Sequence, residues 1–308
     1  MKKLILLIVI LSTAIFAQAH GSKDYIDSDI FKTLANGDKV AILMVHFGTT
    51  HDDTRTLTID AINKKVKEEY PNTEVREAYT SRIIIKRLGD NGIVKQNPLQ
   101  ALQSLHNDGY THILIQSSTI IDGVEMESLF KNAADMKDQF KEIRIGNPLL
   151  YAPEDYEKAI EILTVGYDPQ TAYVWVGHGT SDANTAQYAM LDYMLKSKGH
   201  NNCFVGTIEG YPTFDDMLTQ LKASGLKKVV LVPFMFVAGE HAKNDIAEDW
   251  KNDLEKEGYT VEVSLEGLGQ IPAIQAEYVN HLKFIAKHRK IGIMEKKNIY
   301  EKTGEKMK

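Results

Sequence analysis

Three side chains that can bind a metal ion stand where predicted strands in the second half of the chain end. His178, Glu209 and His241 each follow a short apolar run. The carboxyl ends of parallel strands meet at one edge of a sheet, where α/β proteins bind ligands, so we expect these side chains to converge. Two imidazoles and a carboxylate suit Co, Ni, Fe or Zn and leave positions open for a substrate. Imidazoles also accept protons near neutral pH.

Each of the three residues, taken alone, also fits an ordinary polar loop at a strand end, and only their joint position favours a metal site. The glycines on both sides of His178 let the chain turn sharply after the strand. Ser181 or Asp182 can cap the helix that follows. His46 ends the first predicted strand, opposite His178 in the second half, so it is a further candidate to face the same cleft.

Short apolar runs alternate with longer amphipathic stretches, which is typical of βαβ units. Strands are expected at residues 40–46, 74–78, 112–116, 142–145, 172–176, 203–207, 228–233 and 260–263. Helices are expected at residues 54–69, 98–107, 125–136, 156–163, 183–198, 214–223 and 244–257. The first run is apolar at consecutive positions, as a strand buried on both faces requires. The pattern predicts an α/β fold of mainly parallel sheets flanked by helices.

The two halves of the chain carry similar segments. Residues 41–48 resemble residues 172–179, and residues 109–125 resemble residues 225–241, although few positions are identical. The length of 308 residues also exceeds what one hydrophobic core usually supports. We therefore expect two similar α/β halves with a cleft between them. The N-terminal half is placed at 38–160, and the C-terminal half, which carries the metal ligands, at 161–290.

The first nineteen residues predict a secretory signal peptide. Lys2 and Lys3 precede an apolar run at residues 4–16, and Ala17 and Ala19 fit a cleavage site. An uncleaved membrane anchor is the alternative, but the apolar run is short for a ~30 Å hydrocarbon layer. We expect an exported, periplasmic protein that has no stable membrane insertion after cleavage.

Two further terminal segments are assigned from composition. Residues 20–37 are expected to form a disordered leader, and residues 291–308 a Lys-rich, solvated tail.

Composition and motifs exclude several classes of function. The chain has 42 acidic and 36 basic residues, a net charge of −6, so no nucleic-acid partner is expected. Its single cysteine, Cys203, excludes an internal disulfide and Cys-rich zinc or iron–sulfur sites. The sequence contains no dinucleotide fingerprint, phosphate loop, nucleophile elbow or HExxH helix. Nucleotide chemistry and serine hydrolysis therefore rank low, and no organic cofactor is expected.

Several motifs resemble those of one enzyme family. They are VHFGTT (45–50), AYTS (78–81), PLQALQ (98–103), VGHGT (176–180), EGYP (209–212), VAGEHAKND (237–245) and GLGQIPAI (267–274). Over residues 39–282 the sequence resembles the anaerobic sirohydrochlorin cobalt chelatases, CbiK-like class II tetrapyrrole chelatases that are related in fold to ferrochelatase.

The resemblance implies two flavodoxin-like halves with a tetrapyrrole cleft between them. It implies that His178 and His241 are catalytic residues that bind the metal and accept protons, with Glu209 as a further ligand. It also implies that Glu125 faces the cleft and contacts the tetrapyrrole. The activity implied is insertion of Co²⁺ into sirohydrochlorin with release of two protons, and Fe²⁺ or Ni²⁺ remain open as metal substrates.

The sequence departs from the family pattern at two positions. Thr119 stands where many relatives have a histidine, which some exported relatives use to bind haem between subunits, so haem binding is not carried over. His46 replaces a small residue, and an extra imidazole in the cleft can change the choice of metal or substrate.

Other functions and partners stay open at the level of sequence. Export is unusual for a cobalamin-pathway enzyme, so the main alternative is an exported tetrapyrrole- or metal-binding protein that serves haem, iron or cobalt uptake without turnover. A periplasmic solute-binding protein is a weaker alternative. A homo-oligomer is also left open. Because sirohydrochlorin carries many carboxylates, local cations must offset the acidic charge of the chain, and the candidates are Arg55, Arg82, Lys86 and Lys243.

Overall fold

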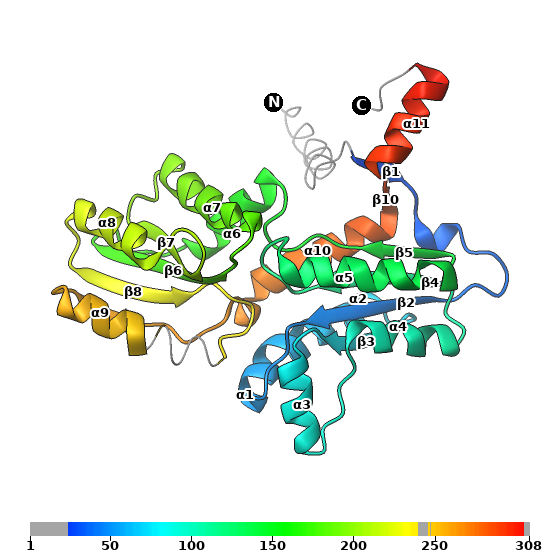
Figure 1. The fold of residues 1–308 in the computed structure, drawn as a ribbon, viewed down its shortest axis with the longest axis horizontal. Helices are drawn as coiled ribbons and strands as arrows, with labels where there is room; N and C mark the ends of the chain where they lie inside the picture. The colour runs from blue at the N-terminus through cyan, green and yellow to red at the C-terminus, as the bar shows by residue number, and fades with distance from the viewer. Residues whose placement is uncertain (1–23, 240–245, 247, 305–308) are drawn as a thin grey trace, which may run out of the picture.

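Two parallel sheets organise the chain in this computed structural model, which describes residues 24–239, 246 and 248–304 (Figure 1). The first sheet has the order β3-β2-β4-β5 and comprises β2 (Val40–His46), β3 (Glu74–Tyr79), β4 (His112–Ser117) and β5 (Glu142–Ile145). The second has the order β7-β6-β8-β9 and comprises β6 (Thr171–Gly179), β7 (Cys203–Glu209), β8 (Lys228–Pro233) and β9 (Thr260–Val263).

The two sheets share one strand order. In each, the first strand of the half lies between the second and the third, and the fourth follows the third at the edge. All neighbouring strands of these two sheets are parallel. This is the beginning of the flavodoxin-like order. The predicted α/β class and the two similar halves are confirmed.

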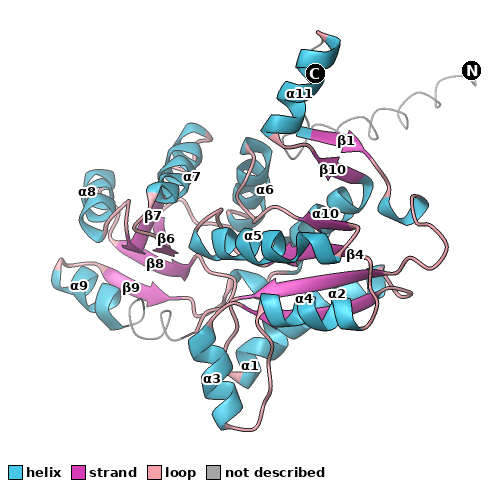
Figure 2. Ribbon diagram, turned by 45° about the vertical axis from the view of Figure 1, so that its right-hand side comes forward, coloured by secondary structure: helices cyan, strands magenta, loops and turns pink. Residues whose placement is uncertain are grey.

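Helices cover both faces of each sheet (Figure 2). The first sheet packs against α4 (Pro98–Asn107) and α5 (Val124–Met136) on one face, and against α2 (Ala61–Glu69) and α10 (Pro272–Lys287) on the other. The second sheet packs against α8 (Phe214–Ser224) and α9 (Lys251–Lys256) on one face, and against α6 (Pro153–Leu163) and α7 (Ala186–Ser197) on the other. The remaining elements are α1 (Asp52–Arg55), α3 (Arg82–Asp90), α11 (Ile293–Thr303), a π-helical turn at Thr56–Asp60, and 3₁₀ turns at Ile30–Lys32, Lys137–Gln139, Ala183–Thr185 and Leu268–Gln270.

One continuous apolar core joins the two halves. It contains Met44 and Leu114 of the first sheet together with Trp175 and Val205 of the second, all of them fully buried. The arrowheads of β2 and β8 both point toward the middle of the molecule in Figure 1. The carboxyl ends of the two sheets therefore meet, which is the arrangement that a site between the halves requires.

Two helices cross between the halves, and they place the boundary differently from the sequence prediction. The predicted boundary at residue 160 lies inside α6, whose apolar side packs with α7 of the second half. Helix α10 was assigned to the C-terminal half, yet it packs under the first sheet, where the hydroxyl of Tyr278 donates to the Ser118 carbonyl at 3.1 Å. A boundary drawn at one residue cannot describe a chain that returns to its first half.

The expected leader and tail are partly folded. Strand β1 (Tyr25–Asp27) pairs antiparallel with β10 (His288–Lys290), and α11 follows the second of these strands. The disorder expected at residues 20–37 is therefore wrong for the described part of that segment. In the segment predicted as a solvated tail, residues 293–303 form helix α11, which buries none of its residues.

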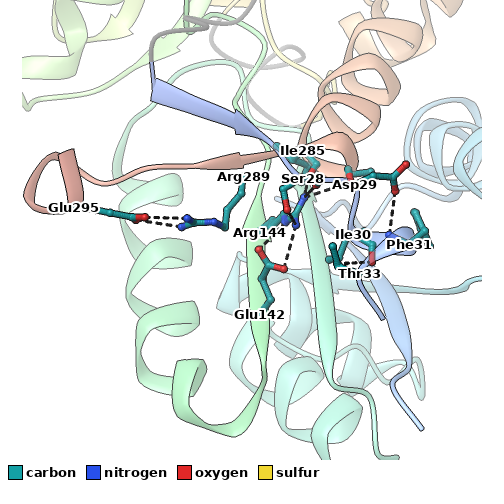
Figure 3. A network of polar contacts seen from close by, with 11 residues as sticks. Ser28, Asp29, Ile30, Phe31, Thr33, Glu142, Arg144, Ile285, Arg289 and Glu295 are labelled. Carbon is teal, nitrogen blue, oxygen red and sulfur yellow. Dashed lines mark hydrogen bonds and ion pairs between the residues drawn. The ribbon is translucent and has the colours of Figure 1, made fainter. Parts of the chain in front are cut away.

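Arg144 of β5 explains why the N-terminal segment is ordered (Figure 3). The residue is 5% exposed, and its guanidinium donates to the carbonyls of Ser28, Ile285 and Ala286 at 2.6, 2.9 and 3.3 Å. It also pairs with Glu142 at 2.9 Å. One buried cation thus ties the N-terminal segment and the end of α10 to the first sheet.

Some predictions fall on residues that the structure does not describe. These are the signal peptide at residues 1–19 and most of the beginning of the helix expected at 244–257. In the described ranges, no helix has the length and apolar character needed to cross a membrane.

Candidate metal centre

His178 and Glu209 lie on neighbouring strands at the carboxyl edge of the second sheet. His178 is the penultimate residue of β6, and Glu209 is the last residue of β7. The register pairs Gly179 with Glu209, one residue beyond His178. The imidazole is half-buried and the carboxylate is exposed. The structure thus brings these two predicted ligands to one edge of the sheet.

Two glycines hold the ends of β6 and β7 unusually close. A Cβ atom at Gly179 would lie 1.7 Å from the carbonyl oxygen of Glu209, and one at Gly210 would lie 2.2 Å from the carbonyl oxygen of Thr180. Both residues have positive φ angles, 81° and 88°. Only glycine combines this backbone conformation with so close an approach. Gly179 of the VGHGT motif and Gly210 of the EGYP motif therefore allow the two strand ends to pack together.

The register also bears on where the two candidate ligands lie. Strict alternation along paired strands would send His178 and Glu209 to opposite faces of the sheet, because Glu209 is aligned with Gly179. Gly179 and Gly210, which follow these residues directly, have left-handed conformations that turn both strands out of the sheet. Convergence of His178 and Glu209 on one ion stays a prediction.

The hydrogen bond of His178 selects a tautomer. Its Nδ1 lies 3.2 Å from the carbonyl oxygen of Gly179. A carbonyl only accepts, so Nδ1 carries the proton and, in the neutral ring, Nε2 carries the lone pair. A backbone carbonyl on the other ring nitrogen is the usual support of a metal-binding histidine.

Two threonines hold the loop that follows Glu209. The hydroxyl of Thr185 donates to the Tyr211 carbonyl at 2.9 Å, and the Thr207 hydroxyl donates to the Pro212 carbonyl at the same distance. The Thr207 amide also donates to the Pro212 carbonyl, at 2.8 Å. The EGYP segment is therefore fixed from both sides, and Tyr211 is left half exposed.

The third predicted ligand, His241, lies outside the described residues. Within residues 24–239, 246 and 248–304, no group of three or more His, Cys, Asp or Glu side chains is arranged to hold a metal ion. The complete set of His178, Glu209 and His241 therefore stays a prediction.

Glu125 lies in the first turn of α5 and is half-buried. The loop before this helix is linked to the second half, because the Asp122 amide donates to the side-chain oxygen of Gln187 at 3.2 Å. Gln187 lies in α7, which follows His178 in the chain. The start of α5 thus lies at the junction of the halves, and the contact of Glu125 with a tetrapyrrole stays a prediction.

The expectation that His46 faces the cleft as an open imidazole is wrong. The ring is 0% exposed. Its Nδ1 lies 2.9 Å from the hydroxyl of Ser118, and its Nε2 lies 3.0 Å from the side-chain oxygen of Asn63. Burial lowers the pKa of this imidazole below its ordinary value of 6.5. With both nitrogens occupied, His46 has no atom to offer a metal or a tetrapyrrole.

Residues 40–287 match the sequence model of the cobalt chelatase (CbiK) family. The chain belongs to this family of metal chelatases. It is 37% identical over 252 residues to the sirohydrochlorin cobaltochelatase of Salmonella typhimurium, which covers 79% of this chain and 95% of that protein. It is 31% identical over 254 residues to the sirohydrochlorin cobaltochelatase CbiKC of Nitratidesulfovibrio vulgaris, which covers 79% of this chain and 89% of that protein.

A solved chelatase structure shares the fold. SirB from Bacillus subtilis with Fe³⁺ aligns with a TM-score of 0.58 at 15% identity, covering 80% of this chain and 96% of that one. This likeness confirms the predicted class of fold, and the match to the family model confirms the predicted family.

One cavity of the described structure lies away from the predicted ligands. It has a volume of about 530 Å³ and is lined by Asp60, Asn63, Lys64, Lys67, Val75, Arg76 and Glu77. These residues come from α2, β3 and the turn before α2. The cavity thus belongs to the first half of this chelatase.

The sequence analysis missed the residues that surround His46. Asn63 and Ser118 are 17 and 72 positions away from it in the chain. One signal was present, because Asn63 stands between Ile62 and Val66 on the buried side of a helix. A polar residue on an apolar helix face normally has a hydrogen-bond partner.

Proposed function

We propose that the protein inserts Co²⁺ into sirohydrochlorin. The observation that carries this proposal is the placement of His178 and Glu209 at the carboxyl edge of the second sheet, in a chain that belongs to the cobalt chelatase family. The same N and O ligands also bind Fe²⁺ and Ni²⁺, so either is an alternative metal substrate.

The reaction replaces two pyrrole N–H protons by one metal ion. It requires a base for the protons, partial removal of water from the metal, and a macrocycle bent enough to expose its nitrogen lone pairs. Binding of the macrocycle by the two halves can stabilise its bent form. Holding metal and ring together adds an effective-concentration effect.

His178, His241 and Glu209 are the groups that we assign to the metal and the protons. We assign Nε2 of His178 to these tasks, because Nδ1 donates to the Gly179 carbonyl. General-base assistance of this kind typically contributes about 10²–10⁴-fold. Glu209 adds a negative charge that favours binding of the divalent ion.

Recognition of the substrate carboxylates rests on cations of the first half. Arg55 is paired with Asp52 at 2.7 Å and Lys86 with Asp90 at 2.9 Å. Arg82 is exposed, and its guanidinium donates to the Thr80 carbonyl at 3.2 Å. We therefore assign Arg82 to a carboxylate of the substrate. Lys243, the fourth candidate, lies outside the described residues.

Two exposed aromatic side chains offer contacts for a flat macrocycle. Phe47 follows β2 and is 48% exposed, and Tyr211 follows β7 and is 50% exposed. Each follows the carboxyl end of a strand by one or two residues, and the two strands belong to different halves of the molecule. Stacking on such rings is favourable for a conjugated ligand.

Multiple turnovers test the proposal. The mature protein, supplied under anaerobic conditions with a large excess of sirohydrochlorin and Co²⁺, should convert many equivalents of the tetrapyrrole, followed by its absorption spectrum. Conversion that stops at one equivalent would instead support the exported tetrapyrrole- or metal-binding protein. A ligand-driven closure without any metal dependence would point to a solute-binding protein.

Residues 1–19 support export as a second part of the proposal, because they carry the features of a signal peptide. Fractionation of the producing cell and the mass of the mature protein test it. Full-length protein retained in the cytoplasm would overturn the periplasmic location.

A further inference from the structure

A chain of hydrogen bonds holds the ring of His46 inside the first half. It runs from the Ser118 hydroxyl to the ring, from the ring to the oxygen of Asn63, and from the Asn63 amide nitrogen to Glu77 at 2.8 Å. Glu77 is paired with Lys95. Four side chains, from strand β3, helix α2 and two loops, thus fix the imidazole at the end of β2.

Glu77 determines which atoms donate and which accept along this series of hydrogen bonds. The carboxylate accepts, so Asn63 donates through its nitrogen and turns its oxygen toward the ring. The ring must then donate through Nε2 and accept the Ser118 proton at Nδ1. His46 is therefore neutral and has one orientation. It is suited to hold a position and has no nitrogen left for proton transfer.

The fixed ring faces the second half of the molecule. Its centroid lies 6.1 Å from that of Phe236, with an angle of 23° between the planes. Phe236 follows the end of β8 by three residues (236 − 233) and is 6% exposed. His46 is itself the last residue of β2. This contact joins the carboxyl edge of one sheet to that of the other.

Tyr278 of α10 contacts both Phe236 and the Ser118 backbone, so that His46, Phe236, Tyr278 and Ser118 form a closed circuit of contacts. Its aromatic ring meets Phe236 edge-on at 5.4 Å, and its hydroxyl donates to the carbonyls of Ser118 and Thr119 at 3.1 and 3.0 Å. Ser118 in turn holds His46. Phe236 therefore packs against two side chains, His46 and Tyr278, and each of these is hydrogen-bonded to Ser118.

We infer that His46 is a positioning residue, which sets the spacing of the two halves through its contact with Phe236. The inference rests on the proposed function only where it concerns turnover. A tetrapyrrole bound by the first half must meet a metal bound by His178 and Glu209 of the second. A displacement of about 1 Å between reacting groups can cost roughly 10²-fold in rate.

The first test measures chemistry. His46→Gln keeps polar atoms at both positions but removes the ring, and Phe236→Leu removes the opposite ring. Each should lower kcat by about 10–100-fold, while the dissociation constant for Co²⁺ alone and the pH dependence of kcat stay at wild-type values. The kcat of the double variant should be no lower than that of the less active single variant, because both substitutions remove the same contact.

The second test needs no activity. Spin labels at Val94→Cys and Tyr193→Cys lie on exposed sites of the first and second halves, and the native Cys203 is buried. The distance distribution between the labels should broaden in His46→Gln. His112→Gln removes another buried histidine of the first half, at the far end of β4, and should leave both the distribution and kcat unchanged.

The outcomes separate the inference from the proposed function. Absence of turnover in the wild-type protein contradicts the proposed function and leaves the label distances to decide the inference. An unchanged distribution in His46→Gln overturns the inference, as does a wild-type kcat per folded molecule. If His46→Gln does not fold, kcat and the label distances are measured in Phe236→Leu and Ser118→Ala instead. The inference predicts the same changes in these variants, and wild-type values would overturn it.

Discussion

Gly179 lies against the backbone of Glu209 so closely that a Cβ atom at position 179 would be 1.7 Å from the Glu209 carbonyl oxygen. No movement of a flexible side chain relieves this contact, since the atom that it meets is backbone. The consequence is that the ends of β6 and β7, with the side chains of His178 and Glu209, form one unit whose geometry depends on a missing methyl group.

Gly179→Ala should therefore disturb the site and the fold together. Gly199→Ala is the matched control, because Gly199 also has a positive φ angle, 88°, but has nothing within 4 Å of an added Cβ. The control should lose roughly 1–2 kcal/mol from the left-handed backbone alone. Gly179→Ala should lose more in urea unfolding and should weaken Co²⁺ binding. Equal losses in the two variants would show that the close approach has no consequence.

The buried imidazole of His46 should make stability depend on pH. Burial lowers its pKa in the folded state below the ordinary 6.5, so the unfolded chain binds more protons at mildly acidic pH. The contribution of His46 is fully present above pH 6.5 and is lost as the pH falls from there toward the folded-state pKa.

Urea titrations between pH 5 and pH 7.5 measure this effect as a difference between two proteins. The free energy of unfolding should decrease more steeply toward low pH in the wild type than in His46→Gln, since the other ionisable groups cancel in the comparison. Parallel curves would contradict a buried neutral imidazole.

Arg144 should hold the N-terminal segment on the first sheet. Arg144→Met leaves Glu142 without its cation and three carbonyls without a donor, so the free energy of unfolding should fall by about 3–5 kcal/mol. Hydrogen exchange of the amides at 25–29 should accelerate. Arg289→Met is the control, because Arg289 forms an exposed ion pair with Glu295 at 2.9 Å and should cost less than about 1 kcal/mol. Similar exchange in both variants would refute the role of Arg144.

Arg82 should contribute to the binding of a carboxylate-rich tetrapyrrole. Arg82→Ala should raise KM for sirohydrochlorin up to about fivefold with kcat unchanged, as loss of a partly exposed ion pair predicts. The effect should shrink as salt is added. Lys86→Ala on the same helix should change neither constant, because Lys86 already pairs with Asp90. An unchanged KM in Arg82→Ala would remove this residue from the binding surface.

Strands β2, β4 and β6 could be predicted from the sequence because they are buried on both faces. The expected strand at 40–46 coincides with β2, and its unbroken apolar run is the reason. Strands β6 and β7 extend further than expected, through His178–Gly179 and Ile208–Glu209, because glycine and charged residues at their ends hide the strand pattern. The two candidate ligands thus belong to the sheet edge itself.

Contacts between segments far apart in the chain could not be predicted from the sequence. The burial of His46 depends on Ser118, 72 residues later, and the order of β1 depends on β10 at the other end of the chain. Each of these partners has an ordinary local sequence. Periodicity identifies which face of an element is apolar, and does not identify which distant element covers it.

The most direct test of the central claim is the initial rate of Co²⁺ insertion into sirohydrochlorin by the His178→Ala, His241→Ala double variant. These two imidazoles are assigned to the metal and to the protons, so the rate should fall by about 10²–10⁴-fold, while His112→Gln keeps the wild-type rate. Circular dichroism should show both variants folded. A double variant that inserts Co²⁺ at the wild-type rate would contradict the account.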